Sequence, residues 1–216
     1  MNLAGVAMSP TIPLGSVLLY RWADVPEIPR GAVVLMDLSA YPGVSAKEGM
    51  AVQRVIGVGG DRVVCCTNDN LITVNGKTVK ETYTDDDNGY GRKECRPFDV
   101  QVPPGTVYLA GDKRNYSADS RFYLDRPGNG AVPLSKVRGV VVGMGSLLGA
   151  EPFPQTTAFV EAGLPGDPLS DTGFRTSRNL VIAGAGLVVL GVIGAIVSVV
   201  RSAGKRRRAA AIPPAR

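Results

Sequence analysis

The most chemically distinctive part of the sequence is GDKRNYSADSR, which runs from Gly111 to Arg121 and combines acidic, basic and hydroxyl side chains. The chain contains no histidine. This excludes Ser-His-Asp and Cys-His triads and removes the commonest zinc ligand. Any catalysis by this chain must therefore use a hydroxyl, a carboxylate, an amine or a thiol.

Short Val-rich runs, separated by Gly, Pro and Asn-Gly, would have to position these groups. The runs lie at Ser16–Tyr20, Ala32–Asp37, Ala51–Val58, Asp61–Cys66, Leu71–Val74, Val100–Val102, Thr106–Ala110 and Gly139–Gly143. Asn75-Gly76 is typical of a two-residue hairpin turn. No window before residue 170 has a helical period, so the sequence predicts a mainly antiparallel β fold.

The chain divides by composition into a β domain and a membrane attachment. We expect a β domain over residues 1–146 and a flexible stalk, rich in Pro, Gly and Thr, over residues 147–178. Residues 179–201 read as a transmembrane helix because about 20 apolar residues span the hydrocarbon layer. A basic cytoplasmic tail, residues 202–216, follows.

The net charge of +5 comes from that tail. Six of the 24 Lys and Arg residues follow residue 200, and the 18 before it face all 19 Asp and Glu residues. The body therefore lacks the basic patch that nucleic-acid binding needs, and the tail would instead attract anionic membrane lipid.

Charge also predicts the topology, because the basic side of a transmembrane helix stays in the cytoplasm. The body should thus lie on the outer face of the cytoplasmic membrane. The first residues, MNLAGVAMSP, have neither a basic start nor an apolar run. We expect an N-terminal membrane helix upstream of the present start; a tail anchor that breaks the charge rule is the alternative.

Three segments resemble, in order, the conserved boxes of type I signal peptidases, the membrane-bound serine proteases that cut leader peptides from exported proteins. They are GVAMSPTI (residues 5–12), QRVIGVGGD (residues 53–61) and the run from Ala110 to Arg121. The resemblance spans about Gly5 to Gly143. It implies a signal-peptidase-like β domain on the outer membrane face and a Ser nucleophile paired with a Lys base, which needs no histidine.

The sequence departs from that family at both members of the dyad. Ala7 stands at the nucleophile position and Gln53 at the general-base position. A methyl group cannot attack a carbonyl, and a carboxamide has no useful basicity.

Other positions that the resemblance implies are kept. Ser117 matches the serine that orients the lysine, and it could hydrogen-bond to Gln53 instead. Asp119 and Arg121 match a bracing pair. The resemblance also places three residues at the peptide-binding surface: Gly5, Met8 and Pro10.

The favoured interpretation is a catalytically inactive homologue that binds leader or exported peptides and is associated with membrane lipid, alone or with an active paralogue. One alternative is a working signal peptidase with a non-standard nucleophile, such as Ser9 assisted by Lys47. On an extended chain Ser9 would point the same way as Ala7 but lie about 7 Å further along. Further alternatives are a deliberately inactivated enzyme and a purely structural surface protein.

The remaining motifs indicate no cofactor and no metal. Adjacent strand residues face opposite ways, so at most one of Cys65 and Cys66 could pair with Cys95. The acidic run Asp85–Asp87 lacks the ligand spacing of a calcium loop and is expected to be a solvated hairpin tip. No helix follows the glycines after Gly57, which excludes a phosphate loop.

Overall fold

The computed structural model describes residues 5–22, 28–45, 49–66, 71–84, 97–145, 149–170 and 172–210. Its strands are β1 (Leu18–Trp22), β2 (Val33–Asp37), β3 (Met50–Val58), β4 (Arg62–Cys65), β5 (Ile72–Val74), β6 (Lys77–Thr78), β7 (Phe98–Gln101), β8 (Thr106–Ala110), β9 (Val132–Pro133), β10 (Val137–Met144) and β11 (Glu151–Pro152). Short 3-10 turns lie at Leu38–Ala40, Arg114–Tyr116, Ser120–Tyr123 and Leu134–Lys136. The helices are α1 (Ala158–Glu161) and α2 (Thr172–Ala210).

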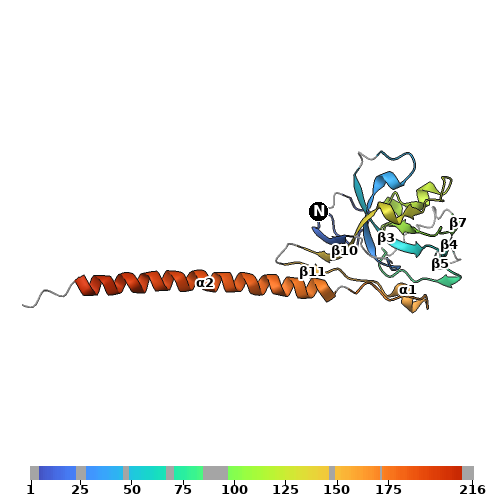
Figure 1. The fold of residues 1–216 in the computed structure, drawn as a ribbon. Coiled ribbons are helices and arrows are strands. Elements are labelled where there is room, and N and C mark those ends of the chain that lie inside the picture. Colours follow the sequence, from blue (N-terminus) through green and yellow to red (C-terminus); the bar gives the residue numbers. More distant parts are fainter. Residues whose placement is uncertain are drawn as a thin grey trace, which may run out of the picture. The chain divides into compact units, whose positions relative to one another are not determined.

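Within the described residues the strands form two antiparallel sheets. The larger has the order β1-β10-β2-β3-β8-β9, with β11 paired to β10, and the smaller has the order β6-β5-β4-β7. In Figure 1, β3 lies between β10 and the strands of the smaller sheet. All eight predicted runs overlap a strand, so the prediction of a mainly antiparallel β domain is confirmed.

The predicted hairpin turn is confirmed by its backbone angles. Asn75 and Gly76 both have positive φ, 53° and 76°, between the paired strands β5 and β6. Two consecutive positive φ values define the turn whose twist matches that of antiparallel strands, and Asn-Gly adopts them at low cost.

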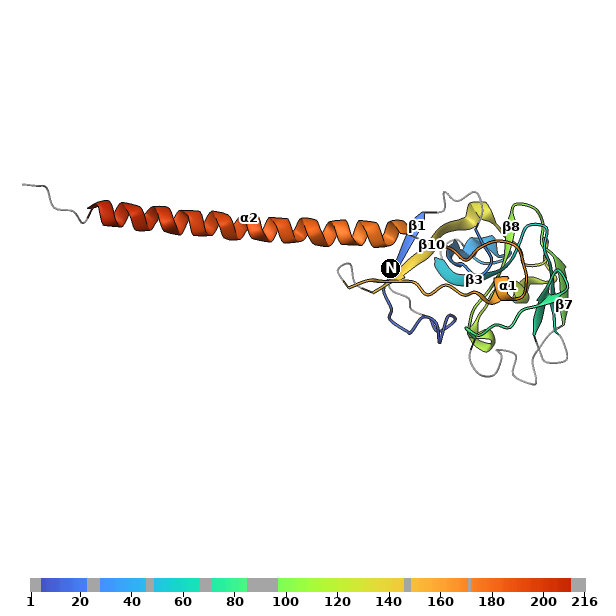
Figure 2. The same cartoon turned by 90° about the horizontal axis from the view of Figure 1, so that it is seen from below.

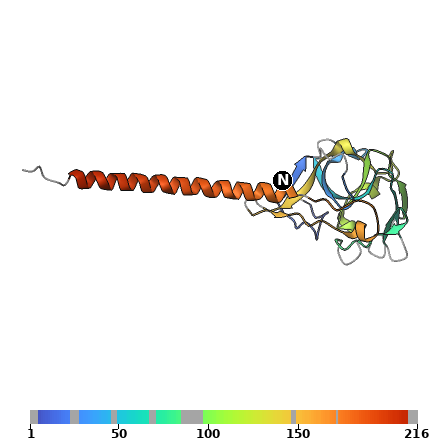
Figure 3. The same ribbon diagram turned by 60° about the horizontal axis from the view of Figure 1, so that its bottom comes forward.

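Strands curve around a common interior, as Figure 3 shows. Along β7 the side chains alternate: Phe98 and Val100 are buried, whereas Asp99 and Gln101 are exposed. In β3, by contrast, residues 52–57 are buried continuously, as expected for a strand covered on both faces. Two polar residues of β3, Gln53 and Arg54, therefore lie in the core and must find partners there.

Residues 149–170, to which composition assigns a flexible stalk, instead pack along the β domain. We call this segment the strap; it runs along one side of the domain in both Figure 1 and Figure 2. Its Phe153, Phe159 and Leu164 are each less than 5% exposed. The composition is misleading because a few apolar anchors, well separated in the sequence, are enough to order a segment rich in Pro and Thr.

The C-terminal part forms a single helix, α2, which contains one candidate membrane span. Residues Asn179–Ala203 have a mean hydropathy of 2.8, and none of the most apolar window is buried in the protein. The predicted span, residues 179–201, lies inside this stretch.

The cysteines differ from expectation. Cys65 and Cys66 are joined to each other by a disulfide, although adjacent strand residues were expected to face apart. The strand β4 ends at Cys65, so the alternation does not continue to Cys66. The predicted partner Cys95 and the acidic run Asp85–Asp87 lie outside the described residues.

Candidate functional site

The segment that carries Ala7 is a compact turn rather than an extended strand. The N–H of Ser9 donates to the carbonyl of Val6 at 3.0 Å, and that of Ile12 donates to the carbonyl of Met8 at 2.8 Å. Met8 is fully buried, so it anchors the turn from below and offers no surface to a peptide. The expectation that Ser9 points the same way as Ala7 assumed an extended chain, whereas the backbone here forms a turn.

Gly111 brings Ala7 and Ser117 together. The N–H of Lys113 donates to the carbonyl of Ala7 at 2.9 Å. A Cβ at Gly111 would stand 2.6 Å from that carbonyl oxygen and would overlap the hydroxyl of Ser117. Only glycine allows this approach, so the chain path itself sets Ala7 beside Ser117.

Gln53 is held in the interior by two hydrogen bonds. Its side-chain carbonyl accepts from the hydroxyl of Tyr41 at 2.8 Å, and its amide donates to the carbonyl of Ala118 at 2.8 Å. Burial, together with the negative charge of Asp119, raises the pKa of Tyr41 well above 10. Tyr41 therefore stays protonated and remains a donor to Gln53.

Ser117 does not bond to Gln53, although the sequence allowed it. Its hydroxyl is buried and has no hydrogen-bond partner within the described part of the chain. The Gln53 amide reaches the next residue, Ala118, instead. A lysine at position 53 would carry three donor protons at its end, whereas the planar amide of Gln53 has a fixed direction.

Asp119 and Arg121 form a two-pronged ion pair, with nitrogen–oxygen distances of 2.8 and 2.7 Å. Asp119 also accepts the N–H of Gly111 at 2.9 Å, and Arg121 donates to the carbonyl of Arg114 at 2.9 Å. This pair thus fixes the loop on which Ala7 rests.

A second, fully buried pair lies beneath the first. Arg54 binds Asp112 through two hydrogen bonds of 2.8 and 2.6 Å, and Thr11 donates to the same carboxylate at 2.5 Å. Burial alone would lower the pKa of Arg54, but the bonds to Asp112 raise it. Because Thr11 belongs to the Ala7 turn, this pair links the turn to β3.

A third pair, Arg114 with Glu81, completes the support. Glu81 also accepts from the hydroxyl of Tyr83, whose ring lies 4.1 Å from the guanidinium of Arg54. Sequence reasoning missed the contribution of Tyr41, Glu81 and Tyr83, since none belongs to a motif. Nothing in the sequence signals them before the fold is known.

One edge of β3 lacks a partner strand beside this cluster; Met50 and Ala51 are partly exposed there, whereas Val52 and Gln53 are buried. Residues Met50–Gln53 pair with β2, but β8 pairs with β3 only from Arg54 to Val58. Within the described residues, the β8 side of Met50–Gln53 therefore has no partner strand. Met50 also packs on the core cluster that contains Met8 and Ile12, so this edge adjoins the Ala7 turn.

The remaining candidate site residues lie at the surface or outside the described part of the chain. Gly5 and Pro10 are exposed, and nothing lies within 4 Å of the place where a Cβ would stand at Gly5. Lys47 lies outside the described residues. No group of three or more His, Cys, Asp or Glu that could hold a metal occurs in the part of the chain that the structure describes.

The described residues thus form an antiparallel β domain in which the Ala7 turn, β3 and the loop Gly111–Arg121 meet around buried ion pairs. The family model described as signal peptidase, peptidase S26, matches residues 1–144. The chain belongs to this family.

Several curated relatives are named signal peptidase I. The one from Mycobacterium tuberculosis is 39% identical over 113 residues, which cover 47% of this chain and 38% of the relative. The one from Bacillus licheniformis is 33% identical over 128 residues, covering 54% and 62% respectively. The matched regions thus span less than two thirds of these relatives.

The chain is also similar to the crystal structure of a signal peptidase I from Enterococcus faecalis. It is 23% identical, has a TM-score of 0.41, and the match covers 54% of this chain and 98% of that one.

Proposed function

We propose that this chain is a membrane-tethered signal peptidase homologue that binds leader or exported peptides without cutting them. The observation that carries the proposal is the chemistry of two positions. Ala7 offers a methyl group where the family's nucleophile would stand, and Gln53 offers an amide whose oxygen and nitrogen are both hydrogen-bonded.

Cleavage would be negligible with this pair. In a serine protease studied by mutation, removing the nucleophile alone costs about 10⁶-fold in turnover, and the further loss of the base adds little. Ser9 is a poor substitute, because it lies two residues beyond Ala7 in a turn and attack tolerates little displacement of the nucleophile.

Binding needs neither missing group. An extended peptide can add to an open strand edge through backbone hydrogen bonds, and the partly exposed Met50 and Ala51, which β8 does not pair, supply the start of such an edge. The N–H of Ala7, which donates no hydrogen bond within the described residues, is a further donor for a peptide carbonyl.

The membrane location rests on the C-terminal segment. The candidate span Asn179–Ala203 is followed by Lys205 and Arg206–Arg208, whereas acidic residues are absent after residue 200. By the positive-inside rule the tail lies in the cytoplasm and the β domain outside. An active paralogue could share this face and hand over its peptides.

To test this function, the full chain in lipid nanodiscs is mixed with a leader peptide whose cleavage site follows the sequence Ala-x-Ala. Mass spectrometry should detect no cleavage, while calorimetry should detect binding. The double variant Ala7→Ser with Gln53→Lys should cleave at the expected bond.

The single variants, Ala7→Ser and Gln53→Lys, are the matched controls and should stay at background. Absence of binding would refute the proposal. So would cleavage by the unaltered chain that Ser9→Ala abolishes, which would establish the alternative of a working peptidase.

A further inference from the structure

All but one of the cationic side chains considered around Ala7 are neutralised by a carboxylate within the described residues. Three arginines each pair with one carboxylate, at nitrogen–oxygen distances of 2.7 Å or less: Arg54 with Asp112, Arg114 with Glu81, and Arg121 with Asp119. These six charges cancel. Lys113, in the middle of the same loop, forms no ion pair within the described residues and leaves the loop with a charge of +1.

The ammonium of Lys113 rests on an aromatic face instead. Its Nζ lies 4.6 Å from the centre of the Tyr116 ring, and Tyr116 is 65% exposed. A cation held on an exposed ring keeps most of its capacity to bind an anion, because the ring neutralises no charge. Lys113 is thus an open anion contact.

This contact adjoins the reacting position. The backbone N–H of Lys113 is bonded to the carbonyl of Ala7, so the two residues are neighbours in space. On the other side of Ala7, its own N–H is available as a second donor. The loop that carries the Lys113 ammonium, together with one amide donor, therefore borders the place where the end of a peptide strand would lie.

The charge of the peptide end decides what such a contact could select. A free C-terminal carboxylate carries a full negative charge shared by two oxygens, whereas the carbonyl of an uncut chain is uncharged. A cation that has no carboxylate partner therefore favours the free end over the uncut chain.

We propose that this site recognises peptides with a free C-terminal carboxylate, bound by Lys113 and the N–H of Ala7, in preference to uncut chains. Such peptides are the products that a leader peptidase releases. The inference rests on the proposed peptide binding and makes it more specific: the partner is a cleaved leader rather than a precursor.

The experiment compares two forms of one leader peptide that ends in Ala-x-Ala, as the free acid and as the C-terminal amide. Binding is measured by calorimetry with the full chain in nanodiscs of neutral lipid. The free acid should bind about tenfold more tightly, which is typical of one charge-assisted hydrogen bond. The ratio should fall as salt is raised.

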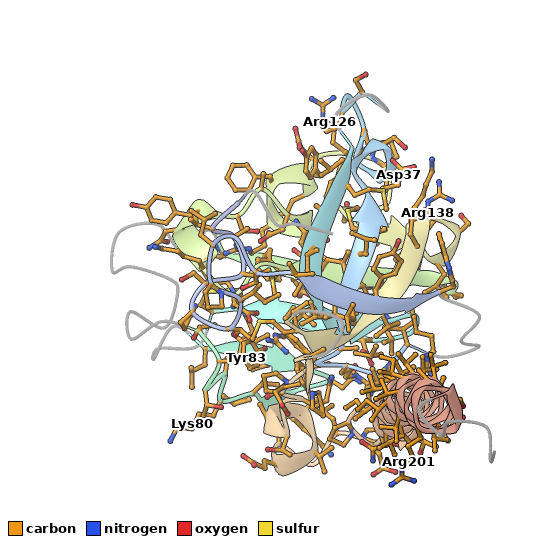
Figure 4. The ribbon with its side chains drawn as sticks, turned by 90° about the vertical axis from the view of Figure 1, so that its left-hand side faces the viewer. Asp37, Lys80, Tyr83, Arg126, Arg138 and Arg201 are labelled. Atoms are coloured by element: carbon orange, nitrogen blue, oxygen red, sulfur yellow. A yellow bond between two sulfur atoms is a disulfide. The ribbon has the colours of Figure 1, made fainter. Side chains whose placement is uncertain are left out.

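Two variants locate the effect. Lys113→Gln should bring the affinities of the acid and the amide together, whereas Lys113→Arg should keep them apart. Lys80→Gln makes the same charge change at an exposed lysine that points away from the domain (Figure 4) and should leave the tenfold ratio unchanged.

The outcomes separate the two proposals. Equal binding of acid and amide would overturn this inference and leave the proposed function standing. Binding of neither peptide would overturn both. A preference for the acid that persists in Lys113→Gln would also overturn the inference, because the recognition would then lie elsewhere.

Discussion

The hydroxyl of Tyr41 donates a 2.8 Å hydrogen bond to the side-chain carbonyl of Gln53, and both side chains are buried. Tyr41 belongs to the loop after β2, and its ring stacks on that of Tyr123 with the centroids 4.3 Å apart. Gln53 lies within β3. One hydrogen bond thus ties a loop to the strand that borders the candidate site and holds position 53 as a neutral amide.

Tyr41→Phe should therefore destabilise the domain by about 1–3 kcal/mol, because it leaves a buried carbonyl oxygen without a donor. Urea denaturation monitored by circular dichroism measures the loss. Tyr123→Phe is the control, since the Tyr123 hydroxyl makes no hydrogen bond within the described residues. Equal effects of the two variants would show that the Tyr41–Gln53 bond contributes nothing.

Ser117→Ala should leave stability unchanged or raise it by up to about 1 kcal/mol. The hydroxyl that it removes is buried and makes no hydrogen bond within the described residues, so its loss removes a desolvation cost. Ser120→Ala removes a hydroxyl that accepts the N–H of Leu109 at 2.9 Å and should cost about 1–3 kcal/mol. Thermal melts of the two variants should shift in different directions; a matching loss in both would contradict this account.

Phe153→Ala should cost about 3–5 kcal/mol, because the ring is buried in the same core cluster as Met8 and Ile12. Loosening that cluster should also weaken peptide binding at the Ala7 turn. Phe122→Ala is the matched control: Phe122 is 67% exposed and its loss should change stability by no more than about 0.5 kcal/mol. If the strap did not pack on the domain, Phe153→Ala and Phe122→Ala would both change the stability by the same small amount.

The carboxyl of Asp37 should titrate near pH 2. Hydrogen bonds from Ser39, and then from Arg138 beside it in Figure 4, lower the pKa of Asp37 from 3.8 to about 2. Because the pKa is lower in the folded protein, its contribution to stability is complete above about pH 3.8 and is lost as the pH falls toward 2. Carbon-13 NMR of the side-chain carboxyl measures the midpoint, and Arg138→Gln should move it upward; a midpoint near 3.8 in the unaltered chain would contradict the geometry.

Much of the fold was predictable because it depends on local patterns. Val-rich runs and the Asn75-Gly76 turn act over a few residues, and both the strands and the hairpin occur where the sequence predicts them. The family was predictable for the same reason, since its three segments are short and contiguous. The strap was not, since Phe153 and Phe159 become anchors only when a distant surface exists to receive them.

The sequence by itself determined that residues 7 and 53 are alanine and glutamine, because residue identity needs no coordinates, and the hypothesis of a substituted dyad rests on these two identities. Only the tertiary structure decided how these residues are used. In the fold, both the oxygen and the nitrogen of the Gln53 amide are hydrogen-bonded, and the Ser117 hydroxyl has no partner within the described residues. The three arginines around Ala7 form ion pairs, whereas the ammonium of Lys113 lies over the Tyr116 ring. The physical reason is that hydrogen bonds and ion pairs act over about 3 Å between groups far apart in the chain, and the fold alone sets those distances.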